Sequence, residues 1–555
     1  MAPVKEYPLM SRDDVEIGIA EGRALLIIDQ YVVKADPWLA YHPGGDKSIL
    51  HMVGKDATDE ATVLHSPEAR EQMKRYRIGR IEGKWASFVP PIQGGKFRTR
   101  QELEEEQRQK RMARGSESSS SGSREPSPVF DVDGPDGLRH RGAAKSDTAS
   151  SIDGDFPPEA IGDGMTYLDS ITREQIELDL NKYPALDVET QANIIQKYRD
   201  LHQRIKDAGL YKCNYWAYAG ESVSYLFFAV MTYVCVANGY FFVGGLALGA
   251  LWHQLVFTAH DAGHMGITHD YYFDSILAII IADFIGGLSM GWWKLSHNIH
   301  HIVTNSPEHD PDIEHLPFFA VSHRFMENLR STYYDKVMKY DAFAKVLLRV
   351  QPYTYYPILS LARFNLYRLS WDYLLAGRGP KKGQAAWLRW LEIAGQVFFW
   401  TWFGYGVCYK MIPDGWSRFV FIMTCNIFSS PLHLQIVLSH FAMSTADLGP
   451  QESFPQKMLR TTMDIDCPPW LDWIHGGLQF QAIHHLYPRI PRHNLRATQK
   501  LVQDFCNDVG IPYALYGFAG GNGEVIGKLA QVSRQAKILA KCQETISKKG
   551  DFFAH

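Results

Sequence analysis

The sequence lacks the features that would place the chain in an oxidising compartment or on a nucleic acid. None of its seven cysteines forms a Cys-x-x-Cys pair, which predicts free thiols in a reducing compartment rather than a disulfide framework. Residues 1–18 lack the apolar core of a signal peptide, so we expect the N-terminus to stay in the cytosol. The net charge is only −4 and no basic patch stands out, which argues against a nucleic-acid partner.

Histidine, in contrast, is concentrated in one stretch of the chain. Seven of the 22 histidines lie within residues 252–301, although the chain has 555 residues. A chain of that length is too long for one hydrophobic core, so we expect several domains. The histidines of this stretch stand at the ends of long apolar runs.

Three histidine clusters have the spacing of one helical face each. Residues at i, i+3 and i+4 share a face of a helix. The first cluster is His260 and His264, the second is His297, His300 and His301, and the third is Gln481, His484 and His485. His440, at the end of a later apolar run, is a further candidate ligand, and His433 is a weaker one.

This set of side chains predicts a transition-metal site. Neutral imidazole suits iron, copper, zinc and nickel. Because a zinc site takes only three or four protein ligands, a set of this size predicts two metal ions rather than one. An all-imidazole site beside a membrane favours iron that activates dioxygen. His309, Asp310 and Asp312 are either partners that orient the ligand imidazoles or residues of a capped loop.

Residues 1–95 are expected to form a small α+β domain that binds haem. Ser11 with the acidic residues after it predicts the start of a helix, and a strand–turn–strand pattern follows. His42 precedes a Pro-Gly-Gly turn that allows a flat ligand to approach, and His65 lies 23 residues further on. Two imidazoles on opposite sides of a haem iron leave no open position, so such a haem transfers electrons.

Residues 96–160 are expected to form a disordered Ser/Gly-rich linker, after an initial charged run that has helix-forming residues but no apolar stripe. Its mean span would be roughly 45 Å. In the haem domain, the acidic run Asp56, Asp59 and Glu60 is either a rim that meets a basic reductase or a solvated face. The glycine-rich segment 517–524 matches no nucleotide-binding fingerprint and is expected to be a loop.

Residues 161–555 are expected to form an all-α polytopic membrane domain with about four transmembrane helices and a cytosolic cap that holds two metals. The four expected spans are residues 216–237, 239–259, 387–411 and 416–442. A fifth apolar run, 273–293, separates the first two histidine clusters. If it crossed the membrane, the clusters would lie on opposite sides, so we expect it to be re-entrant or interfacial.

Several motifs resemble known families. HPGG, DATDE and LHSPEA in residues 42–69 resemble cytochrome b5. HDAGH, HNIHH and QAIHH resemble the three histidine boxes of membrane fatty-acyl desaturases, and the glutamine of the third box resembles the front-end subgroup. That subgroup commonly has Ile-Glu where this chain has Ala482 and Ile483. This difference and the Ser-rich linker resemble fungal delta-8 sphingolipid desaturases.

The resemblance implies a haem b held by His42 and His65 and two iron ions held by the histidine boxes. It also implies dioxygen as oxidant, and electrons from NADH through NADH-cytochrome b5 reductase. The expected reaction is delta-8 desaturation of the long-chain base of ceramides, in the endoplasmic reticulum membrane, with haem and histidine boxes on the cytosolic side. Three alternatives remain open: a front-end acyl-CoA or acyl-lipid desaturase, a lipid hydroxylase, and a haem-bearing electron carrier without lipid chemistry.

Overall fold

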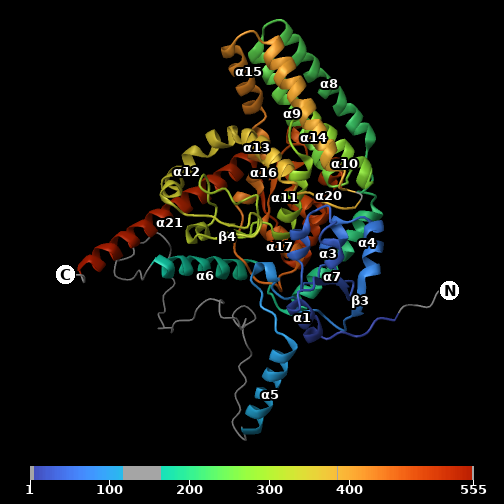
Figure 1. The fold of residues 1–555 in the computed structure, drawn as a ribbon, viewed down its shortest axis with the longest axis vertical. Helices are drawn as coiled ribbons and strands as arrows, with labels where there is room; N and C mark the ends of the chain where they lie inside the picture. The colour runs from blue at the N-terminus through green and yellow to red at the C-terminus, as the bar shows by residue number, and fades with distance from the viewer. Residues whose placement is uncertain (1–5, 117–163, 384, 553–555) are drawn as a thin grey trace, which may run out of the picture.

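The computed structural model describes residues 6–116, 164–383 and 385–552. It contains a small N-terminal domain, drawn in blue in Figure 1, and a larger helical body against which that domain packs. The predicted linker begins with helix α5 (Arg100–Ser116), which is the charged run. The serine-rich remainder of the linker lies outside the described residues.

The N-terminal domain is a three-stranded antiparallel sheet surrounded by short helices. The sheet order is β1-β2-β3, and Leu25 pairs with Lys34 in the first hairpin. Asp29 and Gln30, between these strands, both have positive φ, as a two-residue hairpin turn requires. The elements are α1 (Arg12–Ala20), β1 (Leu25–Ile28), β2 (Tyr31–Lys34), η1 (Asp36–Trp38), α2 (Asp46–Leu50), α3 (Thr58–Leu64), α4 (Pro67–Met73), η2 (Lys74–Tyr76), β3 (Arg77–Arg80) and η3 (Pro91–Gln93).

Local sequence signals explain why this domain folds as predicted. Ser11 caps α1 by accepting a hydrogen bond from the backbone N–H of Asp14, whose side chain accepts from the backbone of Ser11 in return. Strand β1 is buried on both faces, and its side chains form one core with those of β2, α1 and α3. The expected small α+β domain is therefore confirmed.

The helical body begins at residue 164. Its first half contains α6 (Gly164–Lys182), α7 (Val188–Asp207), α8 (Tyr215–Ala237), α9 (Phe241–Gly263), α10 (Tyr271–Ile279), η4 (Ile280–Ile285), α11 (Met290–Val303), η5 (His323–Glu327), β4 (Arg330–Ser331), β5 (Lys336–Val337), α12 (Ala342–Ser360) and α13 (Ala362–Ala376). Its second half contains α14 (Leu388–Phe399), η6 (Trp400–Met411), α15 (Gly415–Phe428), α16 (Pro431–Phe441), α17 (Phe454–Thr461), β6 (Asp464–Asp466), η7 (Pro469–Leu471), α18 (Asp472–His475), η8 (Leu478–Phe480), α19 (Gln481–Leu486), α20 (Arg492–Val509), β7 (Leu515–Gly517) and α21 (Phe518–Phe552).

Among the described residues, three helical segments are long and apolar enough to cross a membrane: Tyr215–Ala237, Phe241–Gly263 and Gly415–Phe441. A fourth is added if the bent pair α10–η4 and α11 counts as one span. The predicted span 387–411 is not among them, although α14 and η6 form a continuous helix there. Its central part is rich in tryptophan, glycine and other residues of low hydropathy and also contains Glu392.

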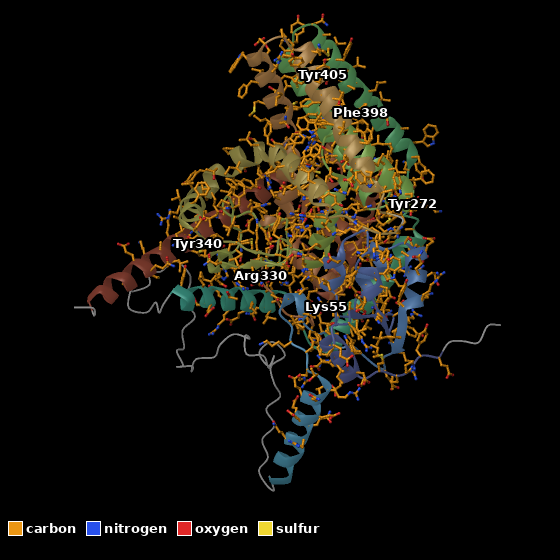
Figure 2. All side chains as sticks on the ribbon, viewed as in Figure 1. Lys55, Tyr272, Arg330, Tyr340, Phe398 and Tyr405 are labelled. Atoms are coloured by element: carbon orange, nitrogen blue, oxygen red, sulfur yellow. The ribbon has the colours of Figure 1, made fainter. Side chains whose placement is uncertain are left out.

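Figure 1 nevertheless shows α14 alongside α8, α9 and α15 in the bundle that projects from the top of the molecule. Figure 2 labels Phe398 and Tyr405 on this bundle, far from Lys55 in the N-terminal domain. Both aromatic side chains are more than half exposed, at 53% and 55%. Large apolar side chains that face outward over several neighbouring helices are typical of a lipid-facing surface.

The apolar run 273–293 forms most of α10–η4, the break after it and the start of α11, which together make a helical hairpin. The axes of α10–η4 and α11 are bent by 118° at the break between them. The backbone carbonyls at the break are satisfied by side chains: the indole of Trp252 donates to Ile285, that of Trp402 donates to Phe284, and Arg363 donates to Gly286. Irregular backbone at membrane depth needs such partners. The hairpin returns the chain so that α11 and its histidines face α9.

The glycine-rich segment 517–524 is not a loop. Gly517 ends strand β7, and helix α21 starts at Phe518 and contains the rest of the segment. A Cβ at Gly521 would lie 3.0 Å from Ile465 and 3.2 Å from Met463, so the small residue allows α21 to approach the core. The expectation was wrong because tertiary packing outweighs the low helix propensity of glycine here.

Candidate metal centre and haem site

The structure brings the three histidine clusters together into two groups. Ligand atoms of the first group, and likewise those of the second, lie within 4.8 Å of one another. The first group is His260, His264, His297 and His484, and the second group is His300, His440 and His485. These residues come from the C-terminal end of α9, from α11, from α16 and from α19. Side chains more than 200 residues apart in sequence thus form one site, in which every residue except the half-buried His260 is buried.

His301 lies between the two groups. Its Nε2 is 3.1 Å from Nε2 of His297, and its ring is stacked on that of His485 with centroids 4.2 Å apart. In the second group, Nε2 of His300 is 3.2 Å from Nε2 of His485. Two imidazoles that share an ion at about 2.1 Å place their nitrogens about 3.0–3.4 Å apart. These nitrogen–nitrogen distances therefore fit pairs of imidazoles that bind the same metal ion.

Several ring nitrogens of these histidines are buried without a hydrogen-bond partner. They are Nε2 of His264, Nε2 of His484, Nδ1 of His301 and Nδ1 of His440. A buried polar atom without a partner is costly, so each such atom calls for an explanation. Metal coordination would explain those of His264, His484 and His440 at once, whereas Nδ1 of His301 lies on the other side of a ring whose Nε2 faces His297. The donor set thus fits two ions bound by imidazole.

The protonation state of the third cluster suits metal binding. Burial lowers the pKa of His484 and of His485 well below the usual value, and neighbouring imidazoles lower it further. Both rings are therefore neutral at physiological pH and keep a lone pair for a metal.

Asp310 orients one of the ligand imidazoles. The Nδ1–H of His300 donates to the Asp310 carboxylate at 2.8 Å, which leaves Nε2 for the metal. Asp310 is fully buried and also accepts a hydrogen bond from the backbone N–H of Asn305. Asp312 lies further away, with Oδ2 3.9 Å from Nδ1 of His300. His309 instead contacts Thr332, so of the three expected orienting residues only Asp310 makes a direct hydrogen bond to a histidine of the groups.

We expect Asp310→Asn to reduce metal affinity by about 10–100-fold, because an amide does not fix the His300 tautomer as a carboxylate does. The measurement is the metal that remains on the purified chain after competition with a chelator. Asp312→Asn is the matched control and should lose less metal, since its oxygen is beyond hydrogen-bond distance. Equal losses in both variants would show that Asp310 has no special orienting role.

Gln481 occupies the N-terminal end of α19 and is buried. Its side chain lies close to that of His440. It therefore lies beside the second histidine group as a partner of a ligand-type side chain. His253 and His433 lie outside both groups; His253 forms a hydrogen bond with the carbonyl of Ile474.

His42 and His65 face each other in the N-terminal domain. Their ring centroids are 5.9 Å apart. The Nδ1 of His42 donates to the carbonyl of Gly45 at 2.8 Å, and the Nδ1 of His65 donates to that of Ala61 at 3.2 Å. Both Nε2 atoms therefore remain available for an iron between the rings. Burial lowers the pKa of His65 to about 3, which keeps its ring neutral. These features fit a haem iron with two imidazole ligands.

The loop that carries His42 packs directly on α11. A Cβ at Gly45 would lie 2.2 Å from Leu295, and one at Gly44 would lie 2.9 Å from Asn298. Only glycine allows this approach at Gly45, which also has a φ of +83°. Lys47 strengthens the contact by donating to the carbonyls of Thr332 and Tyr333 and to Asp335. The haem site is thus held beside the helix that carries the second histidine cluster.

The acidic run of the N-terminal domain does not form a free rim. The carboxylate of Asp59 is almost buried and binds Arg199 of α7 at 2.8 Å.

A second contact joins the haem domain to the helical body at His65. Nη1 of Arg489 donates to the backbone carbonyl of His65 at 2.9 Å. Arg489 follows His485 by four residues, yet no sequence signal distinguishes it from an ordinary surface arginine. Sequence reasoning missed these contacts because each joins residues more than 100 positions apart.

Two family models match the chain. The model for fatty acid desaturases matches residues 238–517, and that for the cytochrome b5-like heme/steroid binding domain matches residues 11–82. The Delta 8-(E)-sphingolipid desaturase of Emericella nidulans is 57% identical, with 100% of both chains covered. Proteins of the same description from Lachancea kluyveri (98% of this chain and 96% of that protein covered) and Kluyveromyces lactis (98% and 95%) are 44% and 45% identical.

Proposed function

Because the chain belongs to the fatty acid desaturase family and carries a cytochrome b5-like domain, we propose that it desaturates the long-chain base of a ceramide or related sphingolipid between carbons 8 and 9. The observation that carries this proposal is the 57% identity, over the whole chain, to a relative described as a Delta 8-(E)-sphingolipid desaturase. The product is proposed to have the same E geometry.

Two iron ions are proposed at the two histidine groups. His260, His264, His297 and His484 would hold one iron, and His300, His440 and His485 the other. His301 lies where it would complete either set, and Gln481 would orient His440. The iron would supply dioxygen-dependent removal of two hydrogens from unactivated methylenes. Dioxygen, these two hydrogens, two electrons and two protons balance as two waters and one double bond.

The protein's own contribution is position and exclusion of water. His301 and His485 are 2% and 0% exposed, so the reacting carbons would lie in a dry site. The carboxylate of Asp310 would hold the imidazole of His300, one of the metal ligands, in a fixed orientation. Regioselectivity would follow from which methylene the protein places beside the site.

The haem domain, residues 1–95, is proposed to deliver the two electrons one at a time to the desaturase domain, residues 161–555. The linker, residues 96–160, would let the haem domain reach a redox partner and return. We propose NADH-cytochrome b5 reductase as that partner and NADH as the electron source. The contact of the His42 loop with α11 supports a short path from the haem to the second histidine cluster.

We propose that the chain lies in the endoplasmic reticulum membrane with the haem domain and all histidine clusters on the cytosolic side. The spans would be α8, α9, α14–η6 and α15–α16, with 273–293 as a re-entrant hairpin. We therefore expect glycosylation tags placed after His269 and before Trp292 to stay unmodified, because both ends of the hairpin would face the cytosol. A tag after Gly239, between α8 and α9, should be modified and serves as the control.

Modification of only one of the two hairpin tags would mean that 273–293 crosses the membrane. The first two histidine clusters would then lie on opposite sides, and the shared site would be impossible.

The experiment that tests the function is expression in a yeast without a sphingolipid desaturase. Long-chain bases and acyl chains are hydrolysed and analysed separately by mass spectrometry, with localisation of double bonds. We expect new unsaturation at carbon 8 of the long-chain base only. Unsaturated acyl chains with unaltered bases would indicate an acyl-lipid desaturase, a hydroxylated base would indicate a hydroxylase, and unchanged lipids would indicate an electron carrier.

A further inference from the structure

Two arginines beside His65 have buried nitrogen atoms without a partner. Arg489, in the segment after α19, is 7% exposed, and its Nε has no hydrogen-bond partner. Arg70 on α4 of the haem domain likewise has a buried Nε without a partner. Among the described residues, neither arginine forms an ion pair with a carboxylate. The two side chains come from different domains: Arg489 donates to the backbone carbonyl of His65, and Arg70 lies on α4, the helix that follows His65.

The electrostatics of this cluster are unfavourable as it stands. Arg489 and Arg70 repel each other as like charges, and Arg70 also repels Lys206 on α7. Tyr211, Glu68 and Asp274 offset part of this repulsion at Arg489, but Glu68 is exposed. A buried guanidinium without a counter-ion is strongly destabilising, so the cluster requires an anion.

We propose that Arg489 and Arg70 bind a propionate carboxylate of the haem, so that the cofactor itself links the two domains. This rests on the proposed binding of haem between His42 and His65. A haem carries two carboxylates at its edge, and Nη1 of Arg489 is already anchored on the carbonyl of His65. The free Nε atoms of the two arginines would then donate to the carboxylate as charge-assisted hydrogen bonds.

The proposed contact between Arg489 and the propionate would bear on electron transfer to the third histidine cluster, because Arg489 lies four residues after His485 of that cluster. A propionate held by Arg489 would connect the haem edge to the backbone that carries the third histidine cluster. The nearby positive charge would also favour the reduced haem, which has one more negative charge than the oxidised haem. Loss of the contact should therefore lower the haem midpoint potential and weaken docking.

The test uses the full chain reconstituted with haem or with haem dimethyl ester, whose propionates are blocked. The readouts are the midpoint potential and the rate at which the irons oxidise reduced haem after dioxygen and ceramide are added. Arg489→Gln with haem should lower the potential and slow this rate about ten-fold, as loss of one charge-assisted hydrogen bond predicts. The ester removes the negative charge of the propionates and raises the potential by itself, so the rate is its readout. The ester should slow the rate about ten-fold in the unaltered chain and should not slow it further in Arg489→Gln.

Arg349→Gln, at an exposed position on α12, is the matched control and should change neither readout. Arg199→Gln removes the ion pair with Asp59 and should slow oxidation while leaving the potential unchanged. If Arg489→Gln fails to fold, Arg70→Gln tests the proposed propionate contact from the haem-domain side, and the ester tests it without any substitution.

Additive slowing by Arg489→Gln and the ester, or an unchanged potential in Arg489→Gln with haem, would overturn the proposed propionate contact while leaving the haem assignment intact. Absence of a two-imidazole haem spectrum from the unaltered chain would instead contradict the proposed function on which the propionate contact rests.

Discussion

Replacement of His485 by alanine is expected to remove one of two non-haem irons and to reduce product formation by at least about 100-fold. His485 is fully buried and lies 3.2 Å from His300, nitrogen to nitrogen, within a group of three histidines. Loss of one imidazole from such a group leaves its iron under-coordinated. Substitution of groups that only orient a ligand typically costs 10–100-fold, and removal of a ligand should cost more.

His264→Ala should have the same effect on the other iron, because His264 belongs to the first group. The measurements are iron per chain in the purified protein and double-bond formation in the long-chain base. His433→Ala is the matched control: His433 lies on α16 seven residues before His440 and belongs to neither group. Two irons retained in His485→Ala, or one lost in His433→Ala, would contradict the assignment.

Replacement of His65 by alanine is expected to abolish desaturation while both non-haem irons remain. The reason is that His65 supplies one of two imidazoles that face each other at 5.9 Å and would hold the haem. Without a bound haem, electrons have no carrier within the chain. The measurements are the visible spectrum, iron per chain and product formation, in cells that contain no free cytochrome b5.

His51→Ala provides the control within the same domain. Its ring accepts a hydrogen bond from Gln93 and lies against His309, away from the His42–His65 pair. We expect this variant to keep the haem spectrum. Full activity of His65→Ala without free cytochrome b5 would rule out the fused haem as the electron donor.

The sequence predicts the site well where the chemistry is encoded locally. The spacing of His260 and His264, and that of His297, His300 and His301, places each set on one helical face, and buried helices then bring the sets together. The proposed haem ligands His42 and His65 follow from short motifs for the same reason. In each case the signal lies within a few residues, so it does not depend on the packing of distant elements.

The sequence predicts poorly what depends on distant packing. The pairing of Asp59 with Arg199 turns an expected reductase rim into a contact between domains. The partition of the histidines into two groups, with His440 completing the second, requires the path of α16 past α11. Gly520, Gly521 and Gly523 lie in a helix because Gly521 packs on the core. These outcomes are decided by side chains far apart in sequence, and periodicity carries no information about them.

The central claim is that the histidine clusters form a two-iron centre separate from the haem. The most direct test is metal analysis of the purified full chain together with Mössbauer spectroscopy after growth on an enriched iron isotope. We predict two non-haem irons for each haem, with spectra that change when dioxygen and ceramide are added to the reduced protein. A single non-haem iron per haem, or zinc in place of iron in an active preparation, would contradict the account.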